Sequence, residues 1–321
     1  MKYQKILLIM ILVFSLTITG CNEQKTQVAK AELTITTGDQ AGTYYPIGNK
    51  IAEILNENMK SVQFKSESSN GSIDNIKRLQ EGKADLAIIQ NDIAYYAANE
   101  VEMFKGNKFD NLRAIASLYP EACQFITLET SGIKSIEDLE GKKVAVGANN
   151  SGTEANARQI LEAYSITYND IDEQFMSFAE SANALKAGEV DAAFITAGCP
   201  TKAVQDIASQ QKIRILPISN EKATILSGLY PYYTKITIPQ NTYDNLNEDI
   251  QTIAVRALLA TSDQFDEKLC SEIVSTIFNN TKELEQAHMI GRFITVENAT
   301  KGISLKMNPG AEKFFRIMNN N

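Results

Sequence analysis

The chain has 321 residues, of which 44% are hydrophobic and 22% are charged, a composition typical of a globular protein with a packed core. The formal net charge of −8 argues against a nucleic-acid partner, because a phosphate backbone favours a basic surface. With a single histidine, His288, and no closely spaced cysteines, the sequence offers few zinc ligands, so we expect neither a metal site nor a cofactor.

The N-terminus has the pattern of an export signal. Two lysines precede the apolar run Ile6–Ile18, which is short for a membrane span of about 20 residues. The run ends at Cys21 in a sequence that resembles the bacterial lipoprotein box. Residues 1–21 are therefore interpreted as a lipoprotein signal, with Cys21 as the lipidated residue of an exported protein held on the outer face of the membrane. An ordinary signal peptide is the alternative. Residues 22–31 are polar and are predicted to form a tether.

The first part of the mature chain alternates between strand and helix patterns. Leu33–Thr37, Val62–Ser66 and the continuously apolar Asp85–Ile89 are predicted strands. Helical spacing of apolar residues follows the first two strands, over Ile47–Leu55 and Ile73–Leu79.

The same alternation continues to the C-terminus. Further strands or extended runs are predicted at 112–119, 124–128, 143–147, 191–195, 213–218 and 232–238, and helices at 155–164, 253–259, 270–278 and 282–289. Strands that alternate with helices indicate an α/β fold with parallel sheets covered on both faces. Two such halves, joined by extended segments near 112–128 and 216–238, predict two lobes with two connections. In such folds ligands bind beyond the carboxyl ends of the strands.

Three loops at those strand ends are rich in Gly, Ser and Thr and lead into helices. They are Gly38–Pro46, Ser69–Ser72 and Ser151–Glu154. Helix N-termini present unpaired N–H groups that bind carboxylate or phosphate, although plain N-capping is the better explanation of any single loop taken alone. Three such loops from two lobes favour a binding site. None matches a P-loop or a dinucleotide fingerprint.

Signals for catalysis are weak, and we expect no enzymatic activity. The sequence lacks a Gly-x-Ser-x-Gly elbow, and a catalytic triad would depend on His288. Cys123, Cys199 and Cys270 are expected to be reduced and buried. An enzyme on the same fold, such as a transferase, is one alternative, and it would need Asp92 or Cys199 as its reactive group.

Several motifs in one order resemble the TAXI family, the solute-binding subunits of TRAP transporters. The motifs are Gly42–Pro46, Gln90–Asp92, Asn111–Glu121, Ser151–Asn156, Ser177–Glu180, Thr196–Gly198 and Asn308–Glu312. They span essentially the whole mature chain. The resemblance implies a type II periplasmic-binding-protein fold with two lobes, a hinge and an interlobe cleft. We place one lobe at residues 32–119 and 236–321, and the other at 120–235.

The resemblance also implies a function: capture of a small anionic or polar solute, such as a glutamate-like amino acid or a dicarboxylate. The solute would pass to an ion-gradient-driven TRAP permease in the membrane, and the receptor would act as a monomer in the periplasm or outside the cell. The ligand-binding residues expected from the motif positions and the loop argument are Thr43, Tyr44, Tyr45, Ser72, Gln90, Asp92, Ser151, Gly152, Thr153 and Gly198.

Two positions depart from the family pattern. Asp39 stands where the first loop is expected to carry Gly, which places a negative charge near the mouth of the site, and Cys199 replaces an expected aliphatic residue. The second alternative for the function is a lipid-anchored sensor subunit that presents bound solute to a signalling receptor.

Overall fold

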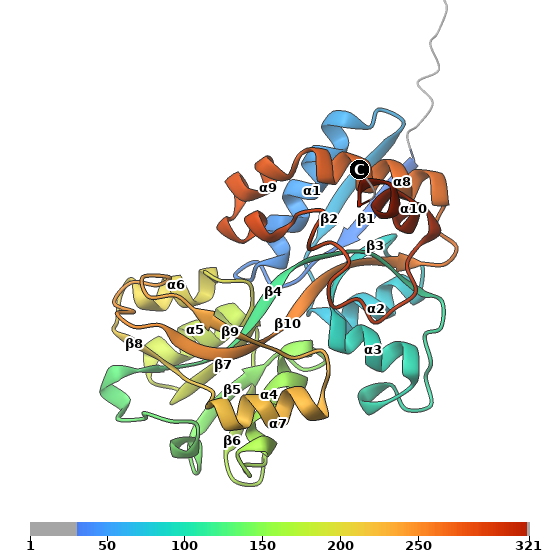
Figure 1. The fold of residues 1–321 in the computed structure, drawn as a ribbon. Helices are drawn as coiled ribbons and strands as arrows, with labels where there is room; N and C mark the ends of the chain where they lie inside the picture. Colours follow the sequence, from blue (N-terminus) through green and yellow to red (C-terminus); the bar gives the residue numbers. More distant parts are fainter. Residues whose placement is uncertain (1–30, 320–321) are drawn as a thin grey trace, which may run out of the picture. The chain divides into compact units, whose positions relative to one another are not determined.

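The computed structural model describes residues 31–319, and within that range ten strands form one sheet. The strands are β1 (Ala31–Thr36), β2 (Val62–Glu67), β3 (Leu86–Gln90), β4 (Leu112–Leu128), β5 (Lys143–Gly147), β6 (Asp172–Phe175), β7 (Ala192–Ala197), β8 (Ile213–Leu216), β9 (Thr234–Ile238) and β10 (Ile250–Ser262). Their order is β2-β1-β3-β10-β4-β7-β5-β6, with β8 beside β4 and β9 beside β10 (Figure 1).

Helices cover both faces of this sheet. The α-helices of the described range are α1 (Tyr44–Asn58), α2 (Ser72–Gln80), α3 (Asn91–Asn99), α4 (Gly152–Ala163), α5 (Phe178–Ala187), α6 (Lys202–Ala208), α7 (Asn220–Leu229), α8 (Glu267–Asn279), α9 (Thr281–Ala287) and α10 (Pro309–Met318). Four short 3-10 segments are η1 (Glu102–Phe104), η2 (Glu129–Ser131), η3 (Glu137–Leu139) and η4 (Met289–Phe293).

The first lobe is built on the parallel strands β1, β2 and β3. Successive side chains of a strand point to opposite faces, so Ile88 packs with α1, α8 and α10 while Ile89 packs with α2 and α3. Figure 1 shows these helices on the two sides of the three strands. Burial of β3 on both faces explains why its sequence is continuously apolar.

The second lobe repeats this plan on β5, β6 and β7. Val144 and Val146 face α4 and α7, whereas Ala145 between them faces the side covered by α5 and α6. β5 is parallel to both β6 and β7. The two lobes therefore present the carboxyl ends of their parallel strands as loops that lead into helices.

The long strand β4 belongs to both lobes. Its first half pairs antiparallel with β10, and its second half pairs antiparallel with β7 and β8. The sequence predicted two strands separated at Pro120, and that prediction was wrong. Pro120 lies opposite Arg256 beside a register shift between Arg256 and Leu258. At such an irregularity a residue without an N–H is tolerated, so the strand continues.

The second connection between the lobes is β10, which the sequence predicted to be a helix over 253–259. That prediction was wrong, as was the one that placed the connection at 216–238, where the structure has β8, α7 and β9. Ile253 through Leu259 contains one charged residue, and its side chains are buried except at Arg256. A strand buried on both faces has no alternation, so periodicity does not separate it from a buried helix.

Most other predicted elements are confirmed with shifts of a few residues at their ends, which is the usual uncertainty of helix and strand boundaries. The two-lobed α/β fold is confirmed, while the lobe boundaries at 119/120 and 235/236 stay predictions. The signal, Cys21 and most of the tether lie outside the described residues. Of the helices in residues 31–319, none combines the length and the apolar character that a membrane crossing requires.

Candidate functional site

A pocket of about 70 Å³ lies where loops from both lobes meet. From the first lobe it is lined by Gly38, Asp39, Gly42, Thr43, Tyr44, Ser69, Asn70, Gly71, Ser72 and Gln90. From β4 and the second lobe it is lined by Glu121, Ala148, Ser151, Gly152, Thr153, Ser177, Phe178, Thr196 and Ala197. We call this pocket the cleft. It lies at the strand ends where an α/β fold is expected to bind its ligand.

Four helices begin at the cleft wall: α1, α2, α4 and α5. In α4 the hydroxyl of Ser151 caps the helix by accepting a hydrogen bond from the backbone N–H of Glu154. α5 begins with a full capping box between Ser177 and Glu180. By contrast, α2 follows Gly71 and has no side-chain cap, so its first N–H groups stay available to a solute. Each of these helix ends contributes a partial positive charge to the cleft wall.

Glu121 is a buried carboxyl group in the cleft wall. It stands on β4 with 2% of its surface exposed, and its Oε2 accepts a hydrogen bond from the Tyr44 hydroxyl at 2.9 Å. Burial raises the pKa of Glu121 well above its usual range, since the charged form is poorly solvated there. Burial and the neighbouring carboxyl group also raise the pKa of Tyr44, which keeps that phenol a hydrogen-bond donor.

The lobes contact each other directly beside the cleft. The Thr43 hydroxyl donates a hydrogen bond of 2.8 Å to the carbonyl of Gly198, and the backbone N–H of Ala203 donates one of 3.0 Å to the carbonyl of Ala41. At Gly152 the approach is closer still, because a Cβ atom there would lie 1.6 Å from Gln90 Oε1. Only glycine permits the start of α4 to come this near to the end of β3.

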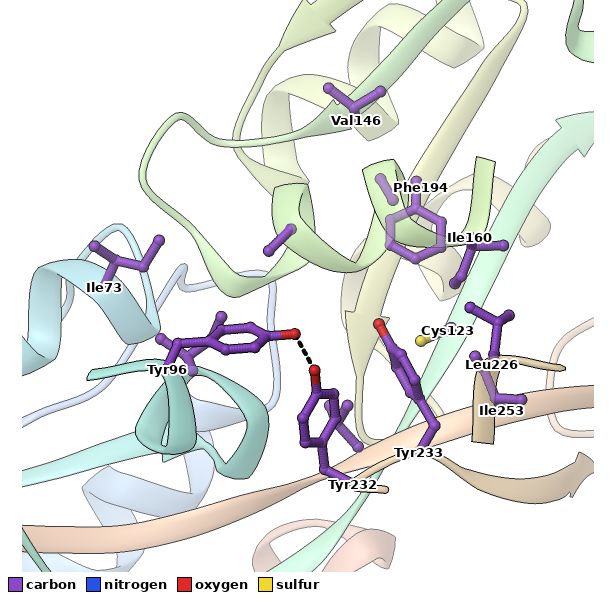
Figure 2. Packing of buried hydrophobic residues seen from close by; sticks show 14 of the residues in the cluster. Ile73, Tyr96, Cys123, Val146, Ile160, Phe194, Leu226, Tyr232, Tyr233 and Ile253 are labelled. Carbon is purple, nitrogen blue, oxygen red and sulfur yellow. Dashed lines mark hydrogen bonds between the residues drawn. The ribbon is translucent and has the colours of Figure 1, made fainter. Parts of the chain in front are cut away.

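Behind the cleft lies a buried chain of polar side chains, here called the Asn156 network. Asn156 accepts a hydrogen bond from Gln90 Nε2 (2.6 Å) and donates to Asp92 Oδ2 (2.7 Å) and Tyr233 Oη (2.8 Å). The chain continues through Gln159, which bonds Tyr233 and Tyr96, and ends at the hydroxyl pair of Tyr96 and Tyr232. Figure 2 shows the two tyrosines pointing toward each other, with Tyr233 beside them.

This network connects the two lobes and reaches the cleft. Gln90 and Asp92 come from β3 and α3, while Asn156 and Gln159 come from α4. Gln90 is shared, since it lines the cleft and is bonded to Asn156. Asp92 Oδ1 has no partner within the described residues, and burial raises the pKa of Asp92 to about 6.

Seven of the ten predicted ligand-binding residues line the cleft: Thr43, Tyr44, Ser72, Gln90, Ser151, Gly152 and Thr153. The structure places the other three outside the lining. Tyr45 is partly exposed on α1, Asp92 is fully buried in the Asn156 network, and Gly198 contacts Thr43 from behind the wall.

Sequence reasoning missed three cleft residues with informative side chains. Glu121 is the lone acid in the apolar run of β4, an unusual residue for a buried strand. Asn70 was inside a loop assigned to the site, and Ser177 begins a Ser-x-x-Glu capping box, a recognisable helix start. Each of these signals could have been read from the sequence.

The cysteines and the histidine lie away from the cleft. Cys123, Cys199 and Cys270 are free thiols, and burial raises the pKa of Cys199 and of Cys270 to about 12 and that of Cys123 further. His288 accepts a hydrogen bond from the N–H of Ile290, and burial lowers its pKa. Within residues 31–319, no cluster of His, Cys, Asp and Glu side chains forms a site for a metal ion.

Several solved structures share this fold with the chain. The periplasmic aliphatic sulphonate binding protein SsuA from Escherichia coli matches at a TM-score of 0.52 and 17% identity, covering 90% of this chain and 84% of its own. PhnD1 from Prochlorococcus marinus, solved with methylphosphonate, matches at 0.56 and 13%, covering 90% and 99%. Tv2483, solved with L-arginine, matches at 0.50 and 16%, covering 84% and 93%. At these identities the likeness shows the fold alone.

A family model matches a much larger part of the sequence than any single motif does. The match runs over residues 35–316, from β1 to α10, and includes every residue that lines the cleft. The chain therefore belongs to the NMT1-like family.

Proposed function

We propose that this chain is a solute receptor that binds a small polar molecule in the cleft and delivers it to a membrane permease. The observation that carries the proposal is the cleft itself, which takes its wall from helix starts and strand ends of both lobes. A solute held there contacts both lobes at once. The solute therefore stabilises the closed arrangement of the lobes, to the extent that it binds the closed form more tightly than the open form.

The size of the cleft favours a small solute. A buried water needs about 10–15 Å³ of such volume, so the 70 Å³ of the cleft accommodate roughly five to seven groups of that size. A small amino acid or a short carboxylic acid fits this range, a longer solute such as glutamate requires the lobes to stand slightly further apart, and an oligosaccharide or a peptide does not fit. Helix starts and hydroxyl groups in the wall supply hydrogen-bond donors for the carboxylate of such a solute.

We propose binding and not catalysis. The thiols lie outside the cleft, and their raised pKa values leave them protonated and poorly nucleophilic at neutral pH. His288 also lies outside the lining, so none of the described residues that line the cleft is a histidine able to activate a hydroxyl nucleophile.

For the partner we propose a TRAP-type permease driven by an ion gradient, with the receptor exported and anchored through Cys21. Support comes from the order of motifs along the mature chain and from the lipoprotein-like residues before Cys21. A glutamate-like amino acid or a dicarboxylate is the solute class that the resemblance implies.

Binding is tested by thermal shift and small-angle scattering on the purified full chain in detergent. The probes are L-glutamate, L-glutamine, L-arginine, glutarate, 2-oxoglutarate and methylphosphonate. We expect at least one amino or carboxylic acid to raise the melting temperature and to reduce the radius of gyration. If no probe changes either quantity, the receptor function is wrong.

Transport is tested separately, by uptake of the identified solute into cells that carry the receptor with a candidate permease. We expect uptake to collapse when the sodium or proton gradient is dissipated while ATP is maintained. Uptake that instead follows ATP would contradict the TRAP assignment and leave the receptor function intact.

A further inference from the structure

The charged side chains of the cleft are all acidic. Among the residues that line it, Asp39 and Glu121 carry carboxyl groups, and none of the lining residues in the described chain is Lys, Arg or His. The wider depression at the mouth includes Arg78, but that guanidinium group is paired with Asp74 at 3.3 Å. A dicarboxylate that lacks an ammonium group would therefore meet two acids and no free cation among the lining residues of the described chain.

Glu121 has an unused hydrogen-bonding atom in the cleft. Its Oε2 is occupied by the Tyr44 hydroxyl, whereas its Oε1 makes no hydrogen bond within residues 31–319. The side chain is 2% exposed, so the free oxygen meets bulk water very little. A carboxyl oxygen of a cleft-lining residue that has no protein partner is suited to a donor brought by the solute, because a polar atom that loses its water when the solute binds needs a new partner.

Hydrogen-bond donors lie on the other side of the cleft. The uncapped start of α2 supplies backbone N–H groups, and Thr153 at the start of α4 supplies a hydroxyl group. Both helices are long enough to carry a dipole, with nine residues in α2 and twelve in α4. These groups suit a carboxylate, so the cleft has an acidic side at Glu121 and a donor side at the helix starts.

We propose that Glu121 receives an ammonium group of the solute, so that the cleft selects zwitterionic amino acids over dicarboxylates of the same length. The proposal deepens the receptor function and rests on it. The solute carboxylate accepts hydrogen bonds on the donor side, at α2 and α4. The ammonium group of the solute donates a hydrogen bond to Glu121 Oε1. A pair of this kind, buried and bonded, is stronger than a neutral hydrogen bond.

The proposal has a pH dependence with a defined sign. Five titratable or charged groups influence the ionisation of Glu121: Tyr44 of α1, Tyr119 and Cys123 of β4, Asp92 of α3 and Arg256 of β10. Burial favours the protonated carboxyl group in the empty cleft. An ammonium group favours the ionised one, so binding releases a proton and affinity rises with pH. A solute carboxylate that used the protonated Glu121 as donor would show the reverse.

The test compares matched solutes on the purified full chain by isothermal titration calorimetry. L-Glutamate and L-glutamine carry the ammonium group, whereas glutarate and 2-oxoglutarate lack it. We expect the amino acids to bind about 10- to 100-fold more tightly, as the loss of a charge-assisted hydrogen bond implies. We expect the ratio of the affinity for the amino acids to the affinity for glutarate and 2-oxoglutarate to increase from pH 6 to pH 8. This measurement uses the unmodified protein.

The variant Glu121→Gln sharpens the result. It should reduce the preference for amino acids about 10-fold and remove its pH dependence, whereas Glu129→Gln, an exposed acid outside the cleft, should change neither. Glutarate or 2-oxoglutarate binding as tightly as glutamate would overturn the ammonium proposal and leave the receptor function standing. A cleft that binds none of the probes named here or above would overturn both.

Discussion

Two polar regions lie side by side between the lobes, and they differ in how their hydrogen bonds are satisfied. In the Asn156 network, Asn156 uses all three of its side-chain bonds within the protein, to Gln90, Asp92 and Tyr233. In the cleft, side chains such as Glu121 and the first N–H groups of α2 face open volume. Apart from Asp92 Oδ1, the side chains of the network are paired within the protein, and such pairing gives rigidity. Polar groups that face open volume give affinity for a solute.

Gln90 joins the two regions, and this explains their arrangement. Its Nε2 donates to Asn156, while its Oε1 accepts the Ser72 hydroxyl at the start of α2. The network thus holds one wall of the cleft in place from behind. A binding site of this kind needs rigid support for its polar groups, because a displaced donor loses most of its value. The predictions below separate support from binding.

The largest effect is expected from Asn156→Leu. The change leaves Gln90 Nε2 and Tyr233 Oη each short of one partner and Asp92 with none on its bonded oxygen. Each unsatisfied buried group costs about 1–3 kcal/mol, so we expect the free energy of unfolding to fall by about 3–5 kcal/mol. Urea unfolding measures this loss, and Asn107→Leu on an exposed loop is the control, with a change within about 0.5 kcal/mol. Equal losses in both variants would contradict a structural role for the network.

Asp92→Asn should change how stability depends on pH. Between the ordinary pKa of 3.8 and the value of about 6 in the folded chain, the folded protein keeps a proton that the unfolded chain has lost. Stability therefore falls as pH rises through this window, by up to about 3 kcal/mol. The Asp92→Asn variant has no carboxyl group to titrate at this position, so its stability should not fall in this way. The difference in free energy of unfolding between variant and parent should therefore rise by about 3 kcal/mol from pH 4 to pH 7. Urea unfolding at several pH values measures the difference.

Asp138→Ala serves as a control of opposite sign. Backbone N–H groups of Lys134 and Ser135 donate to Asp138 and lower its pKa, so its contribution is present at neutral pH and is lost as pH falls. The Asp138→Ala variant should lose stability at pH 7 and approach the parent in acid. If the Asp92→Asn and Asp138→Ala profiles change in the same direction, Asp92 is not a buried acid of the kind described.

Gly152→Ala should disturb both the cleft and the Asn156 network, because Gly152 contacts Gln90, which belongs to both. The added Cβ would lie 1.6 Å from Gln90 Oε1 and 2.9 Å from Ile93, so α4 or Gln90 has to move. We expect a loss of about 1–3 kcal/mol in stability, together with weaker solute binding. Gly228→Ala is the matched control, since Gly228 lies in the helix α7 with open space around it and should gain up to about 1 kcal/mol. Unfolding and calorimetry on both variants separate crowding from helix propensity.

The sequence predicts the loops of the cleft well and the network behind it poorly. The strand-to-helix alternation locates the loops after β1, β2 and β5, and five cleft residues are Gly, Ser or Thr in these loops: Thr43, Ser72, Ser151, Gly152 and Thr153. The family motifs predict Tyr44 and Gln90. The loop argument is local, since each loop follows its own strand. Asn156 and Gln159 carry no such local signal, because their partners stand 66 and 63 residues away on other elements.

The two errors about the connecting strands have different physical causes. β4 was divided at Pro120, which the register shift beside Arg256 accommodates. β10 was predicted to be a helix because it is buried on both faces, as β4 is, and therefore lacks the alternation that marks a half-exposed strand. The same burial hid Glu121, which was part of a family motif yet was not assigned to the site. An acid inside a buried strand needs a reason, and here the reason is the Tyr44 hydroxyl and the cleft beside it.

The smallest effect is expected from Tyr96→Phe, at the end of the network furthest from the cleft. The change removes the hydroxyl that accepts from Gln159 Nε2 at 2.6 Å and bonds to Tyr232, while the ring keeps its edge-on packing against Tyr232 (Figure 2). Two hydrogen bonds are lost, which together cost about 1–2 kcal/mol in the free energy of unfolding. Solute affinity should stay nearly unchanged, because Gln90 keeps its bond to Asn156. Tyr95→Phe, with 37% of the side chain exposed, should change stability by less than about 0.5 kcal/mol. A tenfold loss of affinity in Tyr96→Phe, measured by calorimetry, would mean that support reaches the cleft through the whole network and not through Gln90 alone.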